Sequence, residues 1–155
     1  MNNNAQYLNK NAFYFETELT VNPAPHNQSN FNPRTRQVFK GAKEKAYIAD
    51  LEVRLRAKIN RSKFKKIGPQ PIKVDYIFGF MPPKSWSKKK KLSALNHEIY
   101  PTSSQLGDWD NLCKSTQDRL NALIIEDDRF IVDGRGQKIY TEKPYLKIEI
   151  EEVKQ

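Results

Sequence analysis

Five aspartates and one glutamate lie between Gln105 and Phe130, in the stretch QLGDWDNLCKSTQDRLNALIIEDDRF. Acids at this density can cap a helix and form a turn, offer an acidic patch to a protein partner, or hold a metal ion that acts on a polyanion. The third use is chemical, because a hard divalent cation on carboxylate oxygens stabilises charge on a phosphoryl group and makes a nucleophile from water. The rest of the chain helps to separate these interpretations.

The chain around these acids is strongly basic. Its 155 residues include 27 Lys and Arg against 18 Asp and Glu, which gives a formal net charge of +9 and a pI near 9.6. Such an excess is typical of proteins that bind a polyanion such as nucleic acid, or of a surface kept soluble by its charge. The length predicts one domain, and 37% hydrophobic residues with a mean hydropathy of −0.81 predict a soluble one.

Membrane and disulfide chemistry are not expected. No apolar run approaches the roughly 18 to 20 residues that span a bilayer, and the first residues, MNNNAQYLNKNAF, do not resemble a secretion signal. Cys113 is the only cysteine, so neither an intrachain disulfide nor a cysteine-based zinc site is predicted. We therefore expect a cytoplasmic protein without a membrane partner.

The elements before the acids are predicted from hydrophobic periodicity. Residues 13–21 (FYFETELTV) and 71–80 (PIKVDYIFGF) read as strands, and the latter places Ile72, Val74, Tyr76 and Phe78 on one face. Residues 22–36 read as a loop, and Ser85 is a candidate cap for a short helix after the second strand. A long helix is predicted from Val38 onward, with an apolar face formed by Phe39, Ala42, Ala46, Ala49, Val53 and Ala57.

The acids themselves surround a second predicted helix. Asp110 suits its N-cap, and apolar residues recur through Ile124. Asp108 would lie in extended chain two residues earlier, so that Asp108 and Asp110 could converge on one point. Lys114 follows Asp110 by one helical turn. Two strands, at about 129–140 and 144–153, are expected next, and Asp127 and Asp128 lie at the start of the first.

The conjunction D-x-D-N-x-x-K, one helix, then D-D at the opening of a strand is more demanding than any of its parts. The stretch GDWDNLCKSTQDRLNALIIEDDRFIV resembles the signature of the RusA-like Holliday-junction resolvases, endodeoxyribonucleases common in phages and prophages. FMPPKSWSKKKK, His97 and NPRTR add to the resemblance. Two features depart from the family pattern: Gly107 stands where proline is usual, and the loop between His97 and Asp108 is long and lacks a lysine before the acids.

The resemblance implies a compact single α/β domain with a mixed sheet of about four strands and two to three helices, over residues 13–155 after a flexible segment of residues 1–12. It implies a homodimer that resolves four-way junctions in branched DNA by paired symmetric nicks, in recombination and repair, with Mg²⁺ or Mn²⁺ and no small-molecule cofactor. The ligands would be Asp108, Asp110 and Asp128, with Lys114 near the scissile phosphate or the attacking water. Asn111 and Asp127 would support them, and DNA would be held by Arg34, Arg36, Lys84, Lys88, Lys89, Lys90 and Lys91.

Less specific interpretations stay open for these residues. The lysine run can be only a solvated surface, and Lys114 can simply pair with Asp110 or Asp118 on the helix. The alternative function is a non-catalytic, basic nucleic-acid-binding protein in which the acids are structural. A D-x-D glycosyltransferase is disfavoured, because the chain is too short for the usual nucleotide-binding domain.

Overall fold

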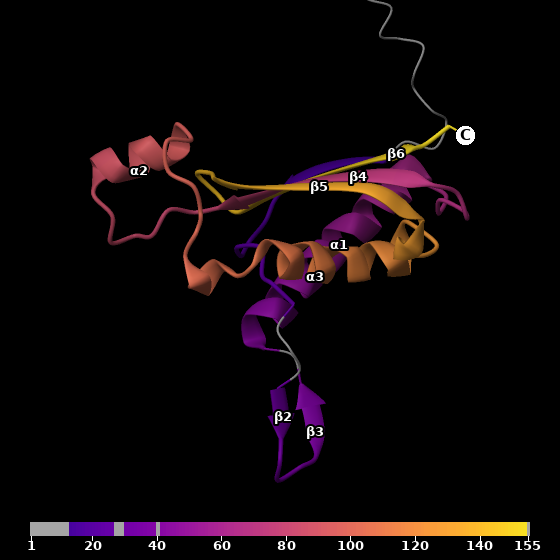
Figure 1. Cartoon of the computed structure of the whole chain (residues 1–155), viewed down its shortest axis with the longest axis horizontal. Helices are drawn as coiled ribbons and strands as arrows, with labels where there is room; N and C mark the ends of the chain where they lie inside the picture. The colour runs from indigo at the N-terminus through magenta and orange to yellow at the C-terminus, as the bar shows by residue number, and fades with distance from the viewer. Residues whose placement is uncertain (1–12, 27–29, 40, 155) are drawn as a thin grey trace, which may run out of the picture.

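Four strands form one mixed sheet in the computed structural model, which describes residues 13–26, 30–39 and 41–154 (Figure 1). Their order is β1-β6-β4-β5, in which β6 is antiparallel to both neighbours and β4 is parallel to β5. The strands span Phe13–Glu18 (β1), Ile72–Phe80 (β4), Ile131–Tyr140 (β5) and Tyr145–Glu152 (β6). The predicted α/β class with a mixed sheet is confirmed, and residues 1–12 lie outside the described part.

Two helices, α1 (Ala42–Ser62) and α3 (Trp109–Leu123), cover one face of this sheet (Figure 1). A parallel strand pair needs a long crossover connection, and between β4 and β5 it consists of α2 (Lys88–Leu95), a 3-10 turn η2 (Ser104–Leu106), α3 and a second 3-10 turn η3 (Asp128–Phe130). The crossover therefore carries the whole acidic stretch. No helix in the described ranges is both long and apolar enough to span a bilayer.

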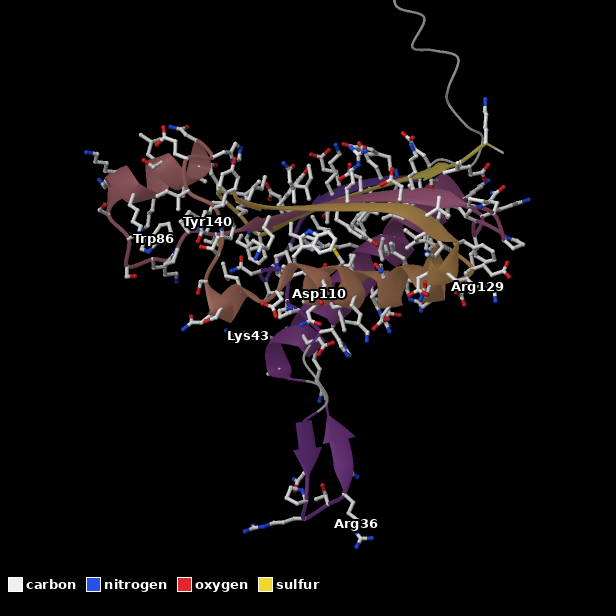
Figure 2. All side chains as sticks on the ribbon, viewed as in Figure 1. Arg36, Lys43, Trp86, Asp110, Arg129 and Tyr140 are labelled. Atoms are coloured by element: carbon white, nitrogen blue, oxygen red, sulfur yellow. The ribbon has the colours of Figure 1, made fainter. Side chains whose placement is uncertain are left out.

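The loop predicted for residues 22–36 is partly wrong, because a two-stranded hairpin forms there from β2 (Asn30–Asn32) and β3 (Gln37–Phe39). Its turn is closed by the Asn32 side chain, whose Oδ1 accepts hydrogen bonds from the backbone N–H groups of Arg34 and Thr35. Arg36 completes the turn with a positive φ of 52°. The hairpin projects away from the sheet and helices, with Arg36 at its tip (Figure 2).

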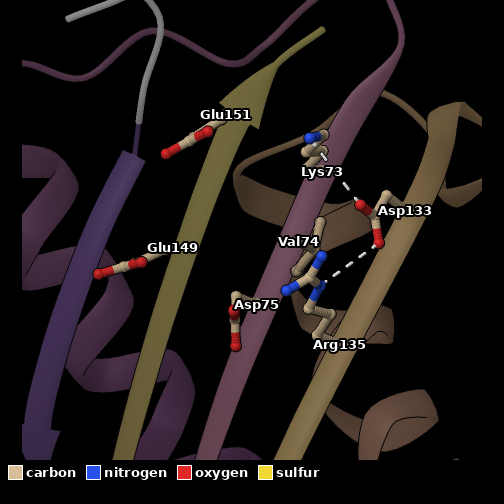
Figure 3. A pocket seen from close by; sticks show the side chains of 7 residues that line it. All are labelled: Lys73, Val74, Asp75, Asp133, Arg135, Glu149 and Glu151. Atoms are coloured by element: carbon tan, nitrogen blue, oxygen red, sulfur yellow. Dashed lines mark ion pairs between the residues drawn. The ribbon is translucent and has the colours of Figure 1, made fainter. Parts of the chain in front are cut away.

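The other face of the sheet is left open by the described helices and is mainly acidic. Side chains alternate along β4, so Val74 and Tyr76 are buried while Lys73 and Asp75 are exposed. A shallow groove of about 200 Å³ runs across this face (Figure 3). Its charged lining is Lys73, Asp75, Asp133, Arg135, Glu149 and Glu151, an excess of acids that disfavours a polyanion on this side.

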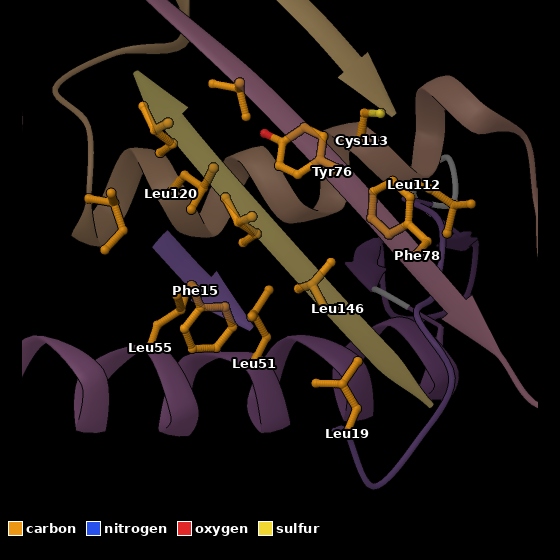
Figure 4. Close-up of a cluster of buried hydrophobic side chains, with 14 of the residues drawn as sticks. Phe15, Leu19, Leu51, Leu55, Tyr76, Phe78, Leu112, Cys113, Leu120 and Leu146 are labelled. Atoms are coloured by element: carbon orange, nitrogen blue, oxygen red, sulfur yellow. The ribbon is translucent and has the colours of Figure 1, made fainter. Parts of the chain in front are cut away.

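The core lies between the sheet and the two covering helices (Figure 4). Its fully buried members include Tyr47, Leu51 and Leu55 from α1, Leu112 and Leu120 from α3, and Phe78, Leu146, Ile148 and Ile150 from the sheet. The apolar face predicted for α1 is wrong: Ala42, Ala46, Ala49 and Val53 are exposed. The larger Tyr47, Leu51 and Leu55 bury more apolar surface than the alanines would, and this outweighs the regularity of the alanine spacing.

Candidate active site

The start of α3 presents two aspartates in a different way from the prediction. Asp108, not Asp110, is the N-cap residue, and its carboxylate makes no capping hydrogen bond. Asp110 lies in the first helical turn, where its Oδ1 accepts a 2.9 Å hydrogen bond from the N–H of Asn111. The expected alternation of an extended chain is therefore wrong, because the helix begins directly after Asp108. Both carboxylates are exposed at the helix end that carries partial positive charge.

Three contacts fix this helix start in place. Gly107 has a φ of +88°, and a Cβ there would lie 2.4 Å from Pro25 Cγ. The Gly107 carbonyl accepts a 3.2 Å hydrogen bond from Lys138 Nζ, and Trp109 Nε1 donates a 2.8 Å hydrogen bond to the carbonyl of Gly136 on β5. Proline, with φ near −65°, cannot adopt the conformation of Gly107, so this departure from the family pattern has a structural cause.

A buried acid behind α3 was not identified from the sequence. Glu44 on α1 is fully buried, and its Oε1 lies 2.9 Å from His26 Nδ1. The backbone N–H of His26 donates to the carbonyl of Asn111, and Ser115 Oγ donates to the carbonyl of Ala24. The chain segment before the hairpin is thereby held against the first turns of α3. The sequence does not indicate this contact, because His26 lies in a loop and its partner Glu44 comes from α1.

Asp127 and Asp128 differ in what their carboxylates do. Asp127 caps η3, because its Oδ1 accepts a 2.8 Å hydrogen bond from the N–H of Arg129. Asp128 is the first residue of η3 and is exposed, with no part in that cap. A capped 3-10 turn, not strand alternation, therefore makes these neighbours unequal.

The helix α3 separates Asp128 from the other two predicted ligands. Its 15 residues span about 22 Å, with Asp108 and Asp110 at its start and Asp128 beyond its end. Figure 2 shows this separation, since Asp110 and Arg129 are labelled at opposite ends of α3. Within residues 13–26, 30–39 and 41–154, no three or more His, Cys, Asp or Glu side chains gather so that they could hold a metal ion. The three-carboxylate site stays a prediction.

The donor chemistry at the start of α3 nevertheless fits Mg²⁺. This ion is usually held by one or two carboxylates together with waters and substrate phosphates, and not by a protein cage. Asp108 and Asp110 supply two such carboxylates, and neither forms a salt bridge within the described residues. Waters and the oxygens of a substrate phosphate would complete the coordination.

Lys114 lies one turn after Asp110 and is exposed. It forms no ion pair with Asp110 or Asp118: within the described residues, the ion pair of α3 is Arg119 Nη1 to Glu52 Oε2, at 3.6 Å. The interpretation of Lys114 as a simple surface pair is therefore not supported by the geometry. Its ammonium group is open to an anionic ligand beside the two carboxylates.

The lysine run forms the first turn of α2, at one end of the sheet. Ser87, not Ser85, is its N-cap, accepting a hydrogen bond from the N–H of Lys90. Trp86 packs edge-on against Tyr140 with ring centroids 5.4 Å apart, which anchors the segment to β5. The ammonium of Lys90 lies 4.0 Å from the centre of the Trp86 ring.

The lysines of this segment differ in whether their ammonium groups already make contacts within the protein. Lys91 Nζ donates a 3.1 Å hydrogen bond to the Lys84 carbonyl, so Lys91 and Lys90 both have structural contacts. Lys88 and Lys89 are exposed at the start of the helix. Together with Arg34 and Arg36 on the hairpin, the predicted DNA-binding cations occupy two separate projections from the sheet.

A pocket of about 240 Å³ lies beside Asp110, between α3 and the strands β4 and β5. Cys113 lines it, and burial together with the charge of Asp110 raises the pKa of its thiol to about 11. Tyr76 also lines it, and burial raises the pKa of its hydroxyl, with smaller contributions from Cys113, Tyr47 and Asp128. Neither group is predicted to ionise near neutral pH.

Comparison with known proteins identifies the family. A family model described as endodeoxyribonuclease RusA matches residues 20–151. The chain therefore belongs to the RusA family of endodeoxyribonucleases. A Bacillus subtilis (strain 168) protein named uncharacterized protein YqaN is 39% identical over 85 residues, which cover 54% of this chain. The match spans 58% of that relative's length.

Proposed function

We propose that this protein is a metal-dependent endodeoxyribonuclease that resolves four-way DNA junctions by paired symmetric nicks, in recombination and repair. The observation that carries the proposal is the start of α3, where the Asp108 carboxylate sits at the N-cap without capping and Lys114, one turn after Asp110, forms no ion pair within the described residues. Membership of an endodeoxyribonuclease family gives this arrangement its substrate class.

Each residue at the start of α3 then has a role in cutting a phosphodiester. Asp108 and Asp110 would hold Mg²⁺ or Mn²⁺, which would supply charge stabilisation at the phosphoryl group and a water of lowered pKa. Lys114 places its ammonium beside the scissile phosphate, where negative charge grows in the transition state. The N–H groups of the first helical turn favour an anion at the same end of α3. Asn111 orients the Asp110 carboxylate through its backbone N–H, and Asp127 caps the η3 turn in which Asp128 lies.

The separation of Asp128 from Asp110 bears on the homodimer. For the three carboxylates to share one metal ion, Asp128 has to come from a second copy of the chain. Two-fold symmetry would then create two equivalent composite sites, as required for cutting two strands of like orientation. We propose that the enzyme is a homodimer and that this composite arrangement is why it needs two chains.

Mixing two inactive variants tests the composite site. Asp110→Asn and Asp128→Asn chains, each inactive alone, would form mixed dimers in which one site holds both substitutions and the other holds neither. Nicking by the mixture, at up to about one site per mixed dimer, is expected if the ligands come from both chains. If each site belongs to one chain, every site in the mixture carries a substitution, and no activity returns.

We expect DNA to contact the β2–β3 hairpin and the α2 segment, and not the open face of the sheet. Arg34 and Arg36 lie in the turn of the hairpin, and Lys84, Lys88 and Lys89 lie in or just before α2, so these cations belong to the two projecting segments. The acidic groove across the outer face of the sheet would repel phosphates. DNA is therefore expected to approach the layer of the molecule that contains α3.

The deciding experiment is cleavage of an end-labelled four-way junction and of a linear duplex of the same sequence, with Mg²⁺ or with EDTA. Two nicks at symmetry-related positions, in the junction only and with Mg²⁺ only, are expected. Binding without nicking under all conditions would replace the enzyme with a non-catalytic DNA-binding protein. Equal cutting of the linear duplex would remove the preference for junctions.

A further inference from the structure

The pocket beside Asp110, called here the α3–β5 pocket, has features that cutting a phosphodiester does not require. Its walls come from β4, from β5 and from the first turns of α3, and include Tyr76, Trp109, Gln117 and Gly134. At about 240 Å³ it is smaller than the roughly 300 Å³ at which pockets for drug-sized ligands begin. It therefore fits one small group, and that group would lie directly beside a proposed catalytic carboxylate.

Tyr76, which lines the α3–β5 pocket, carries a polar atom without a hydrogen-bond partner in the described part of the chain. Tyr76 is only 2% exposed, and within the described residues its hydroxyl makes no hydrogen bond. Leaving a buried hydroxyl unpaired is costly, and native proteins seldom do so unless a water or ligand completes it. Val74 and Ile131 contribute apolar walls to the same pocket.

Gly134 keeps the α3–β5 pocket open. It lies inside strand β5, where glycine is unfavourable because it loses the most conformational freedom on folding. A Cβ at this position would meet only Ile131 Cγ2, at an ordinary 3.7 Å, and the backbone φ does not favour glycine. Neither packing nor conformation thus requires glycine here. Its visible effect is to leave space that a larger side chain would fill.

The α3–β5 pocket also has a fixed aromatic wall and hydrogen-bonding groups. Trp109 is 45% exposed, yet its Nε1 is tied to the Gly136 carbonyl at 2.8 Å, so its ring is held at the pocket. Such rings stack with nucleobases of any kind. Gln117 offers an amide, a group that recognises base edges. The lining carries one carboxylate, Asp110, and one guanidinium, Arg135, so it favours neither sign of charge and suits an uncharged occupant.

We propose that the α3–β5 pocket receives one nucleobase, unstacked from the DNA strand next to the phosphate that is cut, and that this contact selects where the enzyme nicks. The base would stack on Trp109 and hydrogen-bond to the Tyr76 hydroxyl and the Gln117 amide. Enzymes that take a base out of the stack read it in this manner, with an aromatic wall and hydrogen bonds to its edge. The proposal rests on the endonuclease function above.

Filling the α3–β5 pocket tests this proposal. In junctions that carry each of the four bases in turn on either side of the nick, the wild type should favour one base at one position by about tenfold or more. Gly134→Val should reduce that ratio to within about twofold. The matched control is Gly68→Val, since a Cβ at Gly68 meets nothing within 4 Å and Gly68 does not line the pocket. Thermal unfolding of both variants checks that they are folded.

A binding experiment in EDTA makes the test independent of cleavage. Junctions carrying 2-aminopurine at each position around the crossover in turn report unstacking through a change in fluorescence. The change is expected with wild type and Gly68→Val and should be absent with Gly134→Val. Tyr76→Phe keeps the ring and removes only the hydroxyl, and it should lower the base preference several-fold.

The possible outcomes distinguish a failure of the base-binding proposal from a failure of the proposed nuclease function. If the wild type nicks junctions but Gly134→Val keeps both the base preference and the fluorescence change, the α3–β5 pocket holds only solvent and the proposal is overturned, while the nuclease function stands. If the fluorescence change depends on Gly134 but no nicking occurs with Mg²⁺, the base site stands and the nuclease function fails. A Tyr76→Phe variant with unaltered preference would remove the hydroxyl from base recognition.

Discussion

Replacing Asp110 with asparagine is expected to abolish nicking while leaving the fold intact. The side chain is exposed, and its hydrogen bond with the N–H of Asn111 can be kept by the amide oxygen of asparagine. The stability lost is the attraction between one carboxylate and the start of α3, about 0.3 to 1 kcal/mol. In a protein of this size that corresponds to a fall in Tm of no more than about 4 °C.

The expected catalytic loss is much larger than this structural one. If Asp110 holds the metal ion, its loss removes several kcal/mol of charge stabilisation from the transition state. At 1.36 kcal/mol for each factor of ten, the nicking rate should fall by about 10²- to 10⁴-fold. Junction affinity in EDTA should be unchanged or tighter, because one negative charge facing the phosphates is gone.

Single-turnover nicking at saturating enzyme measures the chemical step separately from binding. Asp118→Asn is the matched control, because it makes the same change on α3 two turns further along. A second readout uses Cys113, whose thiol pKa of about 11 is raised first by burial and also by Asp110. Removing the Asp110 charge should lower that pKa, so alkylation of the thiol at pH 9 should become faster. An Asp110→Asn enzyme that nicks within threefold of wild type would refute the assignment.

Three further variants test the surroundings of the site. Lys114→Met should reduce single-turnover nicking by about 10²- to 10³-fold with a small change in affinity, because its cation acts on charge that grows in the transition state. Neutralising Lys88 and Lys89 together should weaken DNA binding and reduce the slope of log affinity against log salt by about 2. Gly107→Ala should lower Tm by several degrees in calorimetry, because φ of +88° costs a non-glycine residue about 1 to 3 kcal/mol and its Cβ would meet Pro25.

Two of these variants have a matched control. For the lysine pair it is Lys65 and Lys66, which are also exposed and carry the same charge. An equal loss of salt dependence in both pairs would show that only net charge matters. For Gly107 it is Gly68→Ala, which meets no atom within 4 Å. A Lys114→Met enzyme that nicks at the wild-type rate would return Lys114 to the solvated surface.

The strands were predictable because their signals are local. Ile72, Val74, Tyr76 and Phe78 alternate with polar residues, and a period of two has few other interpretations. The end of the chain behaves in the same way, and β6 follows the alternation of Leu146, Ile148 and Ile150. The D-x-D-N-x-x-K pattern likewise located the start of α3 to within two residues, because the acids and the apolar stripe point to the same boundary.

Features that depend on distant contacts were not predictable. The buried face of α1 was misassigned because the alanines fit a helical period. The face that is actually buried is the one that packs against the sheet. The hairpin is closed by the Asn32 side chain and has only three residues in each strand, too few for a periodic signal. The distance between Asp110 and Asp128 also depends on the straight run of α3, which residue types alone do not place in space.

The position of β6 has a consequence for how the enzyme is made. It comes after all the other strands in the chain, yet it lies between β1 and β4 and pairs with both, so that Phe13 stands opposite Ile150. Contacts between such distant parts of a chain form slowly, because a long loop must close first. During synthesis, β1 and β4 have no partner between them until β6 emerges. An unfinished polypeptide without β6 would therefore lack the completed sheet that α3 covers, and the proposed active site would not yet be assembled.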